Sequence, residues 1–470
     1  MRILLVQSKG VSKTEDVVFP LGLIYVGTAL LNHKHDVRVF DTNTSTEPMT
    51  AIKKLVRDFE PEAIGVGLRN IDTCSYYDFQ SFVDPFVRLV SELKAMSPKA
   101  PIVAGGPAFS IYARPLMERA KDLDYGVYLE GEETFPELLE NLDRPESVKG
   151  IYYRPNGKVS FTGGRQLLDY SRSFTPRRDI IDMTPYLKNP FSIGVQTKRG
   201  CPFRCVYCNY PLLQGGEFRF RPARDVLDEL ETLKNTYGLK DFFFVDSIFN
   251  MPKEFTREVL EGMLSRGLDL KWRGFDNLKY YDAEYINLAK ESGCDCFEMS
   301  PDGLSGSSLD VLQKDMTTAE IERAYSMMKH TDDIRFCFNF FINAPGESLS
   351  NMVRLAYFMM RSRLILRKKV PYHRLNYVRI YPHSPVQALA IKKGYLTRDN
   401  DLFGPVFYNP PPLKYILPVL MPVSGTVASA IDWTFFKSRK LFKSGRKIEK
   451  RLVSWPARTL NAVKGLAHLF

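Results

Sequence analysis

The sequence predicts an α/β protein with two folded parts and a helical C-terminal extension. Residues 1–142 are predicted to form a doubly wound parallel sheet, with helices on both faces, and residues 191–385 a partial (β/α)6 barrel of the TIM type. In both parts, short apolar runs alternate with amphipathic segments, a rhythm that favours parallel strands joined by helices. Residues 143–190 interrupt this rhythm and are expected to be a linker, and residues 386–470 form the extension.

Length and composition agree with a multidomain globular protein. The chain has 470 residues, 44% of them hydrophobic and 25% charged, so it exceeds one typical domain and can bury a sizeable core. Seven cysteines, three of them clustered, argue against a disulfide framework and favour a reducing compartment. Residues 1–7 form a short apolar strand without the longer apolar region of a secretory signal. We therefore expect a cytoplasmic protein.

Five strand-and-helix units follow one another in the first part. The expected strands are residues 3–6, 37–40, 63–66, 102–104 and 126–129, and the helices after them are residues 21–31, 49–59, 79–96, 109–119 and 135–142. Ligands of such sheets bind at the carboxyl ends of the strands. Three glycine-containing turns lie at those ends: Pro20-Leu21-Gly22-Leu23, Gly105-Gly106-Pro107 and Glu130-Gly131-Glu132-Glu133. They let a flat ligand approach the backbone, although each alone is also ordinary turn chemistry.

The linker contains one strong local pattern. Residues 150–154 and 158–162 flank Asn156-Gly157, a dipeptide typical of a tight hairpin turn. Three prolines keep long helices out of the rest of the segment: Pro176, Pro185 and Pro190. We therefore predict a hairpin followed by an irregular joining segment.

In the second part six strands alternate with helices. The expected strands are residues 191–195, 241–245, 271–274, 294–299, 335–342 and 375–380, and the helices between them are residues 223–237, 254–266, 283–292, 318–329 and 352–361. Active sites of such barrels lie on the loops that follow the strands. Polar residues within or just after the strands are therefore binding candidates: Asp246, Glu298, Asn339 and Arg379. The alternative for each is a structural hydrogen bond to neighbouring backbone.

Three cysteines after the first of these strands are the most informative residues. Cys201, Cys205 and Cys208 have the spacing C-x3-C-x2-C. Three thiolates can hold three irons of a cubic iron–sulfur cluster and leave the fourth iron open for chemistry. A zinc site would need a fourth ligand, and the nearest histidine is His330. Three cysteines are also compatible with a disulfide plus a leftover thiol, or with three unrelated core residues, but the spacing favours the cluster.

This loop resembles the cluster-binding motif of radical S-adenosylmethionine (SAM) enzymes. The resemblance implies that the three cysteines bind a [4Fe-4S] cluster, that the open iron binds SAM, and that an external electron donor reduces the cluster. Residues 245–249 and 343–347 resemble two further motifs of that family. By resemblance, Asp246, Glu298 and Arg379 help to hold SAM, and Asn339 is included with them. Residues 299–303, Met-Ser-Pro-Asp-Gly, depart from the family's Glu-Ser-Gly.

The first part resembles the Rossmann-like cobalamin-binding domain that precedes many radical SAM enzymes. The resemblance implies a corrinoid lying on the strand ends, with these contacts: Pro20, Leu23, Arg69, Gly105, Gly106, Gly131 and Glu132. The Asp-x-His-x-x-Gly motif that supplies a histidine to cobalt in cobalamin carriers does not occur in the sequence. We hypothesise that the loop of residues 68–72, which includes Arg69, covers that face of the cobalt.

The remaining cysteines are interpreted as structural. Cys294 and Cys296 occupy alternate positions of one expected strand and are predicted to point the same way, while Cys337 lies on another strand. We interpret these three as buried thiols. Cys74 is a weak candidate for facing the corrinoid.

The positive charge of the chain is concentrated near its end. The net charge is +11, and residues 437–451 contain eight basic residues and one acid. The uncharged segment 415–431 is interrupted by prolines and is too short to span a membrane. A basic, amphipathic tail favours either peripheral contact with the anionic inner face of a membrane or a helical cap on the barrel. Nucleic acid is not an expected partner, because no readout motif accompanies the charge.

These resemblances imply a cobalamin-dependent radical SAM methyltransferase that methylates an unactivated carbon of its substrate. Carbon methylation of this kind requires no side-chain general base, so no catalytic side chain is assigned. One alternative is a non-methylating cyclisation or rearrangement with the same cofactors. Another is a non-catalytic iron–sulfur or corrinoid-binding redox protein. The tail favours a lipid, isoprenoid or pigment as substrate, with a peptide, protein or antibiotic precursor as the alternative.

Overall fold

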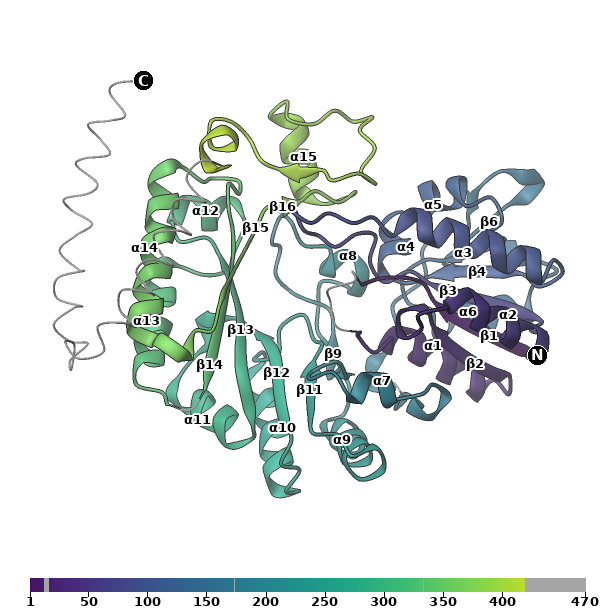
Figure 1. Cartoon of the computed structure of the whole chain (residues 1–470), viewed down its shortest axis with the longest axis horizontal. Coiled ribbons are helices and arrows are strands. Elements are labelled where there is room, and N and C mark those ends of the chain that lie inside the picture. The colour runs from purple at the N-terminus through teal and green to yellow at the C-terminus, as the bar shows by residue number, and fades with distance from the viewer. Residues whose placement is uncertain (12–16, 173, 333, 419–470) are drawn as a thin grey trace.

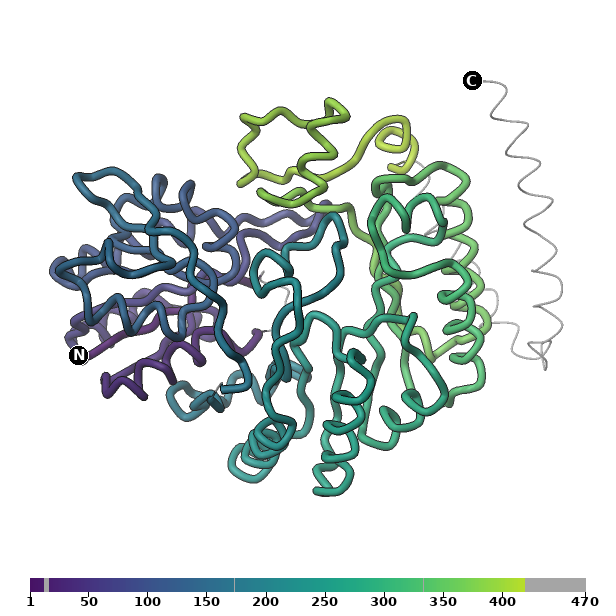
Figure 2. Tube along the Cα trace, turned by 180° about the vertical axis from the view of Figure 1, so that it is seen from behind, coloured from purple at the N-terminus to yellow at the C-terminus, as the bar shows by residue number. Residues whose placement is uncertain are grey.

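The computed structural model describes residues 1–11, 17–172, 174–332 and 334–418. In Figure 1 the N-terminal part (purple to blue) lies beside the barrel (teal to green), and the segment after residue 384 (yellow-green) lies above both. The view from behind shows the same arrangement (Figure 2). Both parts have the α/β architecture that the sequence predicts.

The first sheet has the strand order β2-β1-β3-β4-β5-β6-β7. Its strands are β1 (Arg2–Gln7), β2 (Asp36–Asp41), β3 (Ala63–Gly67), β4 (Ile102–Gly105), β5 (Tyr125–Val127), β6 (Ile151–Tyr153) and β7 (Ser160–Phe161). Its helices are α1 (Leu21–Asn32), α2 (Pro48–Phe59), α3 (Val83–Met96), α4 (Pro107–Ile111), α5 (Ala113–Arg119) and α6 (Thr134–Glu140). The first five strands are parallel, whereas β6 and β7 pair antiparallel. The predicted hairpin therefore extends the first sheet and makes it mixed.

The second sheet is open and entirely parallel, in the order β8-β11-β12-β13-β14-β15. Its strands are β8 (Gly194–Val195), β11 (Asp241–Phe244), β12 (Lys271–Asp276), β13 (Cys294–Asp302), β14 (Arg335–Phe341) and β15 (His373–Asn376). Its helices are α9 (Ala223–Tyr237), α10 (Lys253–Ser265), α11 (Ala283–Glu291), α12 (Gly306–Val311), α13 (Thr318–Lys329) and α14 (Leu349–Leu366). Because β8 and β15 do not pair, the barrel is partial, as predicted.

The remaining short elements lie between or after the strands of these two sheets. They are α7 (Thr184–Leu187), β9 (Lys198–Arg199), α8 (Tyr210–Gln214), β10 (Arg219–Phe220), β16 (Val378–Arg379), α15 (Pro385–Lys392) and β17 (Phe407–Tyr408). The 3-10 turns are η1 (Thr42–Thr44), η2 (Pro145–Ser147), η3 (Pro155–Gly157), η4 (Tyr170–Arg172), η5 (Arg178–Ile180), η6 (Leu278–Tyr280) and η7 (Arg367–Lys369).

The last expected barrel strand, residues 375–380, is divided in two. β15 ends at Asn376, whose side chain donates a hydrogen bond to the carbonyl of Cys74 in the first part and accepts one from the Tyr377 amide at 2.9 Å. The chain then leaves the sheet, and β16 pairs antiparallel with β17. Arg379 is thereby removed from the barrel.

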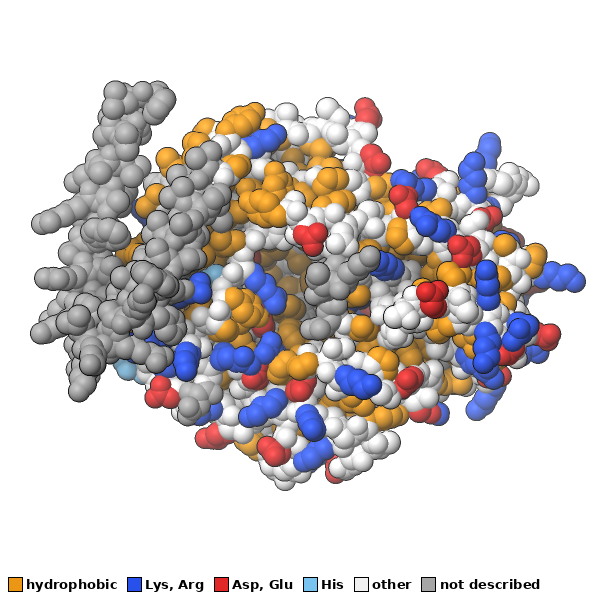
Figure 3. All heavy atoms as spheres, in the orientation of Figure 1, with side chains coloured by type: hydrophobic (Ala, Val, Ile, Leu, Met, Phe, Trp, Pro, Cys, Tyr) orange, Lys and Arg blue, Asp and Glu red, His pale blue; other side chains and the backbone are white. Residues whose placement is uncertain are grey.

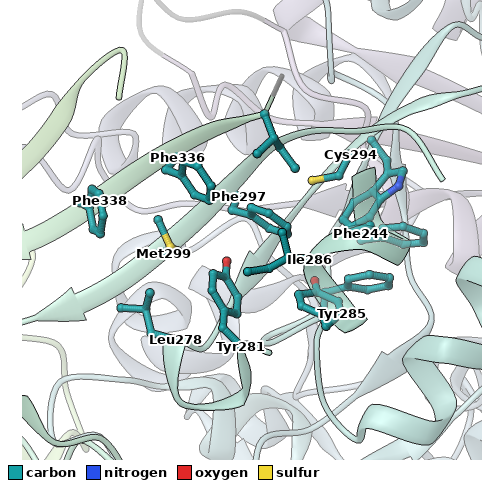
Figure 4. Packing of buried hydrophobic residues seen from close by; sticks show 14 of the residues in the cluster. Phe244, Leu278, Tyr281, Tyr285, Ile286, Cys294, Phe297, Met299, Phe336 and Phe338 are labelled. Atoms are coloured by element: carbon teal, nitrogen blue, oxygen red, sulfur yellow. The ribbon is translucent and has the colours of Figure 1, made fainter. Parts of the chain in front are cut away.

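Aromatic side chains form the core between the second sheet and its outer helices. Figure 4 shows Phe244, Phe297, Phe336 and Phe338 packed from neighbouring strands. The fully buried Trp272 ring lies 5.4 Å from that of Phe244. Aromatic pairs of this kind contribute beyond the area that they bury. They hold the helices to one face of the sheet and leave the other face directed at the first part (Figure 1).

The described surface carries interspersed cationic and anionic side chains over both parts (Figure 3). Among the described residues, no helix is long and apolar enough to cross a membrane. The predicted basic tail and its membrane contact lie in residues 419–470, outside the described residues.

Asp276, the last residue of β12, is buried beneath two tyrosines. Its Oδ2 accepts hydrogen bonds from Tyr285 at 2.7 Å and from Tyr281 at 3.1 Å, and its Oδ1 has no partner among the described residues. Burial raises the pKa of this carboxyl from 3.8 to about 7, and the hydrogen bonds from the tyrosines oppose only part of that shift.

We predict that the protein loses stability between about pH 4 and pH 7 because of Asp276. Its pKa is higher in the folded state than in the unfolded state, so the folded protein binds this proton more tightly. The free energy of unfolding therefore falls as pH rises from the unfolded pKa to the folded pKa. The loss is on the order of 4 kcal/mol. Asp276→Asn should flatten this slope in urea unfolding measured across that range. Equal slopes for both proteins would contradict the prediction.

Candidate functional site

A cavity of about 870 Å³ lies where the carboxyl ends of the parallel strands of the two sheets face each other. Its walls come from the loops after β1, β3, β4 and β5, the start of α1, the ends of β8, β11 and β12, and residues 207–210 and 213–214. This position agrees with the rule that open parallel sheets bind ligands beyond their strand ends. The volume is at the upper end for sites that hold small organic molecules.

All seven residues predicted to contact cobalamin line this cavity: Pro20, Leu23, Arg69, Gly105, Gly106, Gly131 and Glu132. Cys74 also lines it. Gly106 has a positive φ of +102°, and a Cβ added there would lie 2.7 Å from the Leu68 carbonyl oxygen. Only glycine therefore allows the turn after β4 to pack against the loop after β3.

The cysteine loop is fixed to its surroundings by backbone contacts. The Cys201 amide donates to the Gly215 carbonyl at 3.1 Å, and the Val206 amide donates to the Leu312 carbonyl at 3.1 Å. Gly200, with a φ of +92°, precedes the loop, and a Cβ at this position would lie 1.9 Å from the Glu217 carbonyl oxygen. Only glycine therefore fits at position 200 without moving the backbone of Glu217.

The three cysteine thiols belong to one loop, and one of them opens into the cavity. Cys208 lines the cavity, and its sulfur accepts a hydrogen bond from the Tyr210 amide at 3.5 Å. Burial raises the pKa of all three thiols, and that of Cys208 to about 12. The thiolate form that binds metal therefore depends on a metal replacing the proton.

A buried acid–base group that the sequence did not single out supports this loop. The Asp302 carboxylate at the end of β13 accepts hydrogen bonds from the hydroxyl of Tyr207 and from the ammonium of Lys314. Lys314 also donates to the Tyr207 hydroxyl at 3.0 Å. In the sequence, the only feature that pointed to this group was the departure of residues 299–303 from the family motif.

A second missed group joins the cysteine loop to the first part. Arg199, two residues before Cys201, forms ion pairs with Glu130 at 3.0 Å and with Glu132 at 2.6 Å, and all three side chains are 8% exposed. Arg219 forms a further pair with Glu130 at 2.8 Å. Although burial opposes ionisation, the hydrogen bond from Arg219 and the charge of Arg199 hold the pKa of Glu130 below its usual value. Glu132, predicted as a cobalamin contact, is thus tied to the segment that leads into the cysteine loop.

Asp246, predicted to hold SAM, has other partners in the structure. It is fully buried, its Oδ1 accepts from the amide of Thr197 at 2.8 Å, and its Oδ2 accepts from the Thr197 hydroxyl at 2.6 Å. The ammonium of Lys198 lies 3.3 Å from the same carboxylate. Asp246 does not line the cavity. It ties the segment that leads into the cysteine loop to the end of β11.

Arg379 and Asn339 also lie away from the cavity walls. Arg379 forms a fully buried ion pair with Asp72 of the first part at 2.9 Å and donates to the Leu402 and Val406 carbonyls. Its role in the structure is to connect the two parts. The Asn339 amide donates to the Met299 carbonyl at 3.1 Å, on the inner face of the barrel.

Glu298 likewise does not line the cavity. Its Oε1 accepts from the Tyr372 hydroxyl at 3.0 Å, and its side chain lies beside two cysteines of the barrel. None of the four residues predicted to hold SAM therefore lines the cavity in which the cobalamin candidates gather.

Two family models match the chain on either side of this cavity. Residues 8–139 match the B12 binding domain, and residues 195–359 match the radical SAM superfamily. The chain belongs to the cobalamin-dependent radical SAM enzymes. Its cofactors are accordingly a [4Fe-4S] cluster, SAM and cobalamin.

Known relatives carry the names of two kinds of enzyme. An uncharacterized methyltransferase of Pyrococcus horikoshii is 28% identical over 326 residues, which are 67% of this chain and 69% of that protein. An anaerobic magnesium-protoporphyrin IX monomethyl ester cyclase of Cereibacter sphaeroides is 26% identical over 276 residues, which are 55% of this chain and 45% of that protein. Relatives of this chain thus include methyltransferases and cyclases by name.

A solved structure resembles the whole arrangement. The radical SAM methyltransferase TsrM from Kitasatospora setae, with cobalamin and a [4Fe-4S] cluster bound, is 20% identical to this chain. The match covers 87% of this chain and 82% of that chain, with a TM-score of 0.73. At this identity the likeness is one of fold.

The residues at the site fit the family's cofactors. Cys201, Cys205 and Cys208 lie on one loop, and cysteine thiolates are the ligands that hold a [4Fe-4S] cluster. The glycine-lined strand ends leave room for a flat ring, and Cys208 borders the same space.

We predict that Gly200→Ala prevents cluster assembly, because its Cβ would collide with the Glu217 backbone. Iron in anaerobically purified protein should fall from about four per chain to near zero. Gly216→Ala is the matched control, since nothing lies within 4 Å of a Cβ at that position. Iron retained by the Gly200→Ala variant at the level of the control would contradict this account of the loop.

Proposed function

We propose that this enzyme is a methyltransferase that adds a methyl group to an unactivated carbon. When bound, the cluster and SAM supply hydrogen-atom abstraction, and cobalamin supplies the methyl group. The observation that carries the proposal is the shared cavity: residues of the cobalamin-binding part and Cys208 of the cysteine loop border one space. In the proposed assignment, Cys201, Cys205 and Cys208 hold the cluster.

The cavity walls support a reaction without side-chain acid–base catalysis. Its described acidic residues are all in ion pairs: Glu130 and Glu132 with Arg199, and Asp72 with Arg379. No histidine is among the described residues that line it. The chain's own contribution would then be to bind, to orient and to exclude water.

We further propose an apolar substrate, of the lipid, isoprenoid or pigment class. The barrel contributes Phe243, Val245 and Phe275 to the cavity walls, and 37% of Phe275 is exposed. An apolar surface of this kind favours an apolar ligand over a charged one. A cyclisation with the same cofactors is the second candidate, because relatives carry the name of a cyclase.

The methyl-transfer assay uses the anaerobic holoenzyme, a reductant, SAM with a deuterated methyl group, and a lipid extract as the substrate source. We expect one labelled methyl group in an apolar product, together with 5′-deoxyadenosine. Cys208→Ala should abolish both while cobalamin stays bound, because this thiol serves the cluster alone. Unlabelled cyclised product with 5′-deoxyadenosine would favour the cyclase instead, and cofactor binding without SAM cleavage would reject both.

Arg69 gives a separate test of the cobalamin assignment. It lines the cavity in the loop after β3, so Arg69→Ala should change the absorption spectrum and the affinity of bound cobalamin. The exposed Arg88 of α3 provides the control, and Arg88→Ala should leave both unchanged. Identical spectra and affinities for the two variants would remove Arg69 from the cobalamin site.

A further inference from the structure

Three side chains of metal-binding type meet on the inner face of the barrel, apart from the cofactor cavity. They are Cys296 and Glu298 of β13 and Cys337 of β14, with 1%, 3% and 1% of their surfaces exposed. One ligand atom from each lies within 4.8 Å of the other two, and the two sulfurs are 3.1 Å apart. None of the three lines the cavity.

The strand register brings these residues together. Glu298 lies directly opposite Cys337 in the parallel pair, and Cys296 is two residues earlier on the same face of β13. An irregularity in the pairing of β12 with β13 separates Cys294 from Cys296. Cys294 instead packs in the outer core with Phe244 and Phe297 (Figure 4). The prediction that Cys294 and Cys296 point the same way is therefore wrong.

The Glu298 carboxylate is incompletely satisfied in this position. Its Oε1 accepts from Tyr372 at 3.0 Å, but its buried Oε2 accepts no hydrogen bond from any described residue. Arg273 is 4.0 Å away and is itself paired with Asp295 at 2.7 Å. A buried carboxylate oxygen without a partner is costly. One carboxylate oxygen of Glu298 lies within 4.8 Å of both sulfurs, so a ligand bound among the three side chains could satisfy this carboxylate.

A metal ion explains this arrangement better than a disulfide does. A disulfide would draw the sulfurs together to about 2.05 Å and leave Glu298 Oε2 unsatisfied. A tetrahedral ion with metal–sulfur bonds of about 2.3 Å would hold them roughly 3.8 Å apart and take the carboxylate oxygen as well. Two thiols that lose their protons to a dication leave the net charge of the site unchanged.

We propose that Cys296, Cys337 and Glu298 bind a thiophilic divalent cation, represented by Zn²⁺, with water beside Tyr372 in the fourth position. Thiolate and carboxylate are ligands that zinc accepts. Glu298 precedes Asp302, which contacts the cysteine-loop residue Tyr207, by four strand residues, or roughly 13 Å. The ion is therefore separate from the cluster. It joins β13 to β14 in a sheet that lacks the closure of a full barrel.

The decisive experiment is zinc K-edge absorption spectroscopy on the holoenzyme, purified without chelator from zinc-supplemented cells. Iron and cobalt do not interfere at this edge. We expect about one zinc per chain, with two sulfur ligands at about 2.3 Å and oxygen ligands in the remaining positions. This result on the wild-type protein needs no variant that could fail to fold.

Variants locate the ion. Cys337→Ser and Glu298→Gln should each lower zinc at least about fivefold while iron and cobalamin remain bound, because lost ligands weaken the site. Cys294→Ser, in the same strand but outside the site, should keep it. The proposal is overturned by absence of zinc, by zinc with four sulfur ligands and a matching loss of iron, by equal zinc in all variants, or by a Cys296–Cys337 disulfide in peptide mass spectra.

Discussion

The buried ion pairs of Arg199 with Glu130 and Glu132 are the constraint on which the site depends. Arg199 precedes Cys201 by two residues, and the two glutamates follow the fifth strand of the cobalamin-binding part. Removing one partner of such a buried pair typically costs about 3–5 kcal/mol, because the other charge is left uncompensated. The Asp72–Arg379 pair is a second buried connection between the parts. Together they hold the two parts in one orientation, which the proposed reaction in a shared cavity would require.

In this arrangement, charged side chains join the two parts and apolar side chains line the cavity. The acidic residues that line the cavity, Asp72, Glu130 and Glu132, form ion pairs that hold the two parts together. Phe243, Val245 and Phe275 provide apolar walls. Such a division suits chemistry that cofactors perform, since radicals need shielding from water more than they need a general base. Asp246 and Asp302 also have structural roles, because both position the cysteine loop through buried hydrogen bonds.

Local patterns in the sequence correctly predicted the strands and glycine turns, because these depend on residues that are close together in the chain. Apolar periodicity predicted the parallel strands, and the turns with Gly106 and Gly131 were placed at the edge where they lie. The partners of charged residues were not predictable in this way. Arg379 was assigned to a barrel strand, but Asn376 ends that strand and Arg379 pairs with a residue more than 300 positions away in sequence. A strand irregularity turned Cys294 away from Cys296, and no periodic pattern reveals such a shift.

The most direct test of the central claim is the magnetic coupling between paramagnetic cobalamin and the reduced cluster, measured by electron paramagnetic resonance. The wild-type enzyme should show one narrow distance. Arg199→Gln should keep both cofactors and SAM cleavage, but broaden the distance and lose methylated product, because the two parts are no longer held in one orientation. Arg224→Gln, whose side chain is 83% exposed, should behave as wild type. An unchanged distance and full turnover in Arg199→Gln would contradict the account.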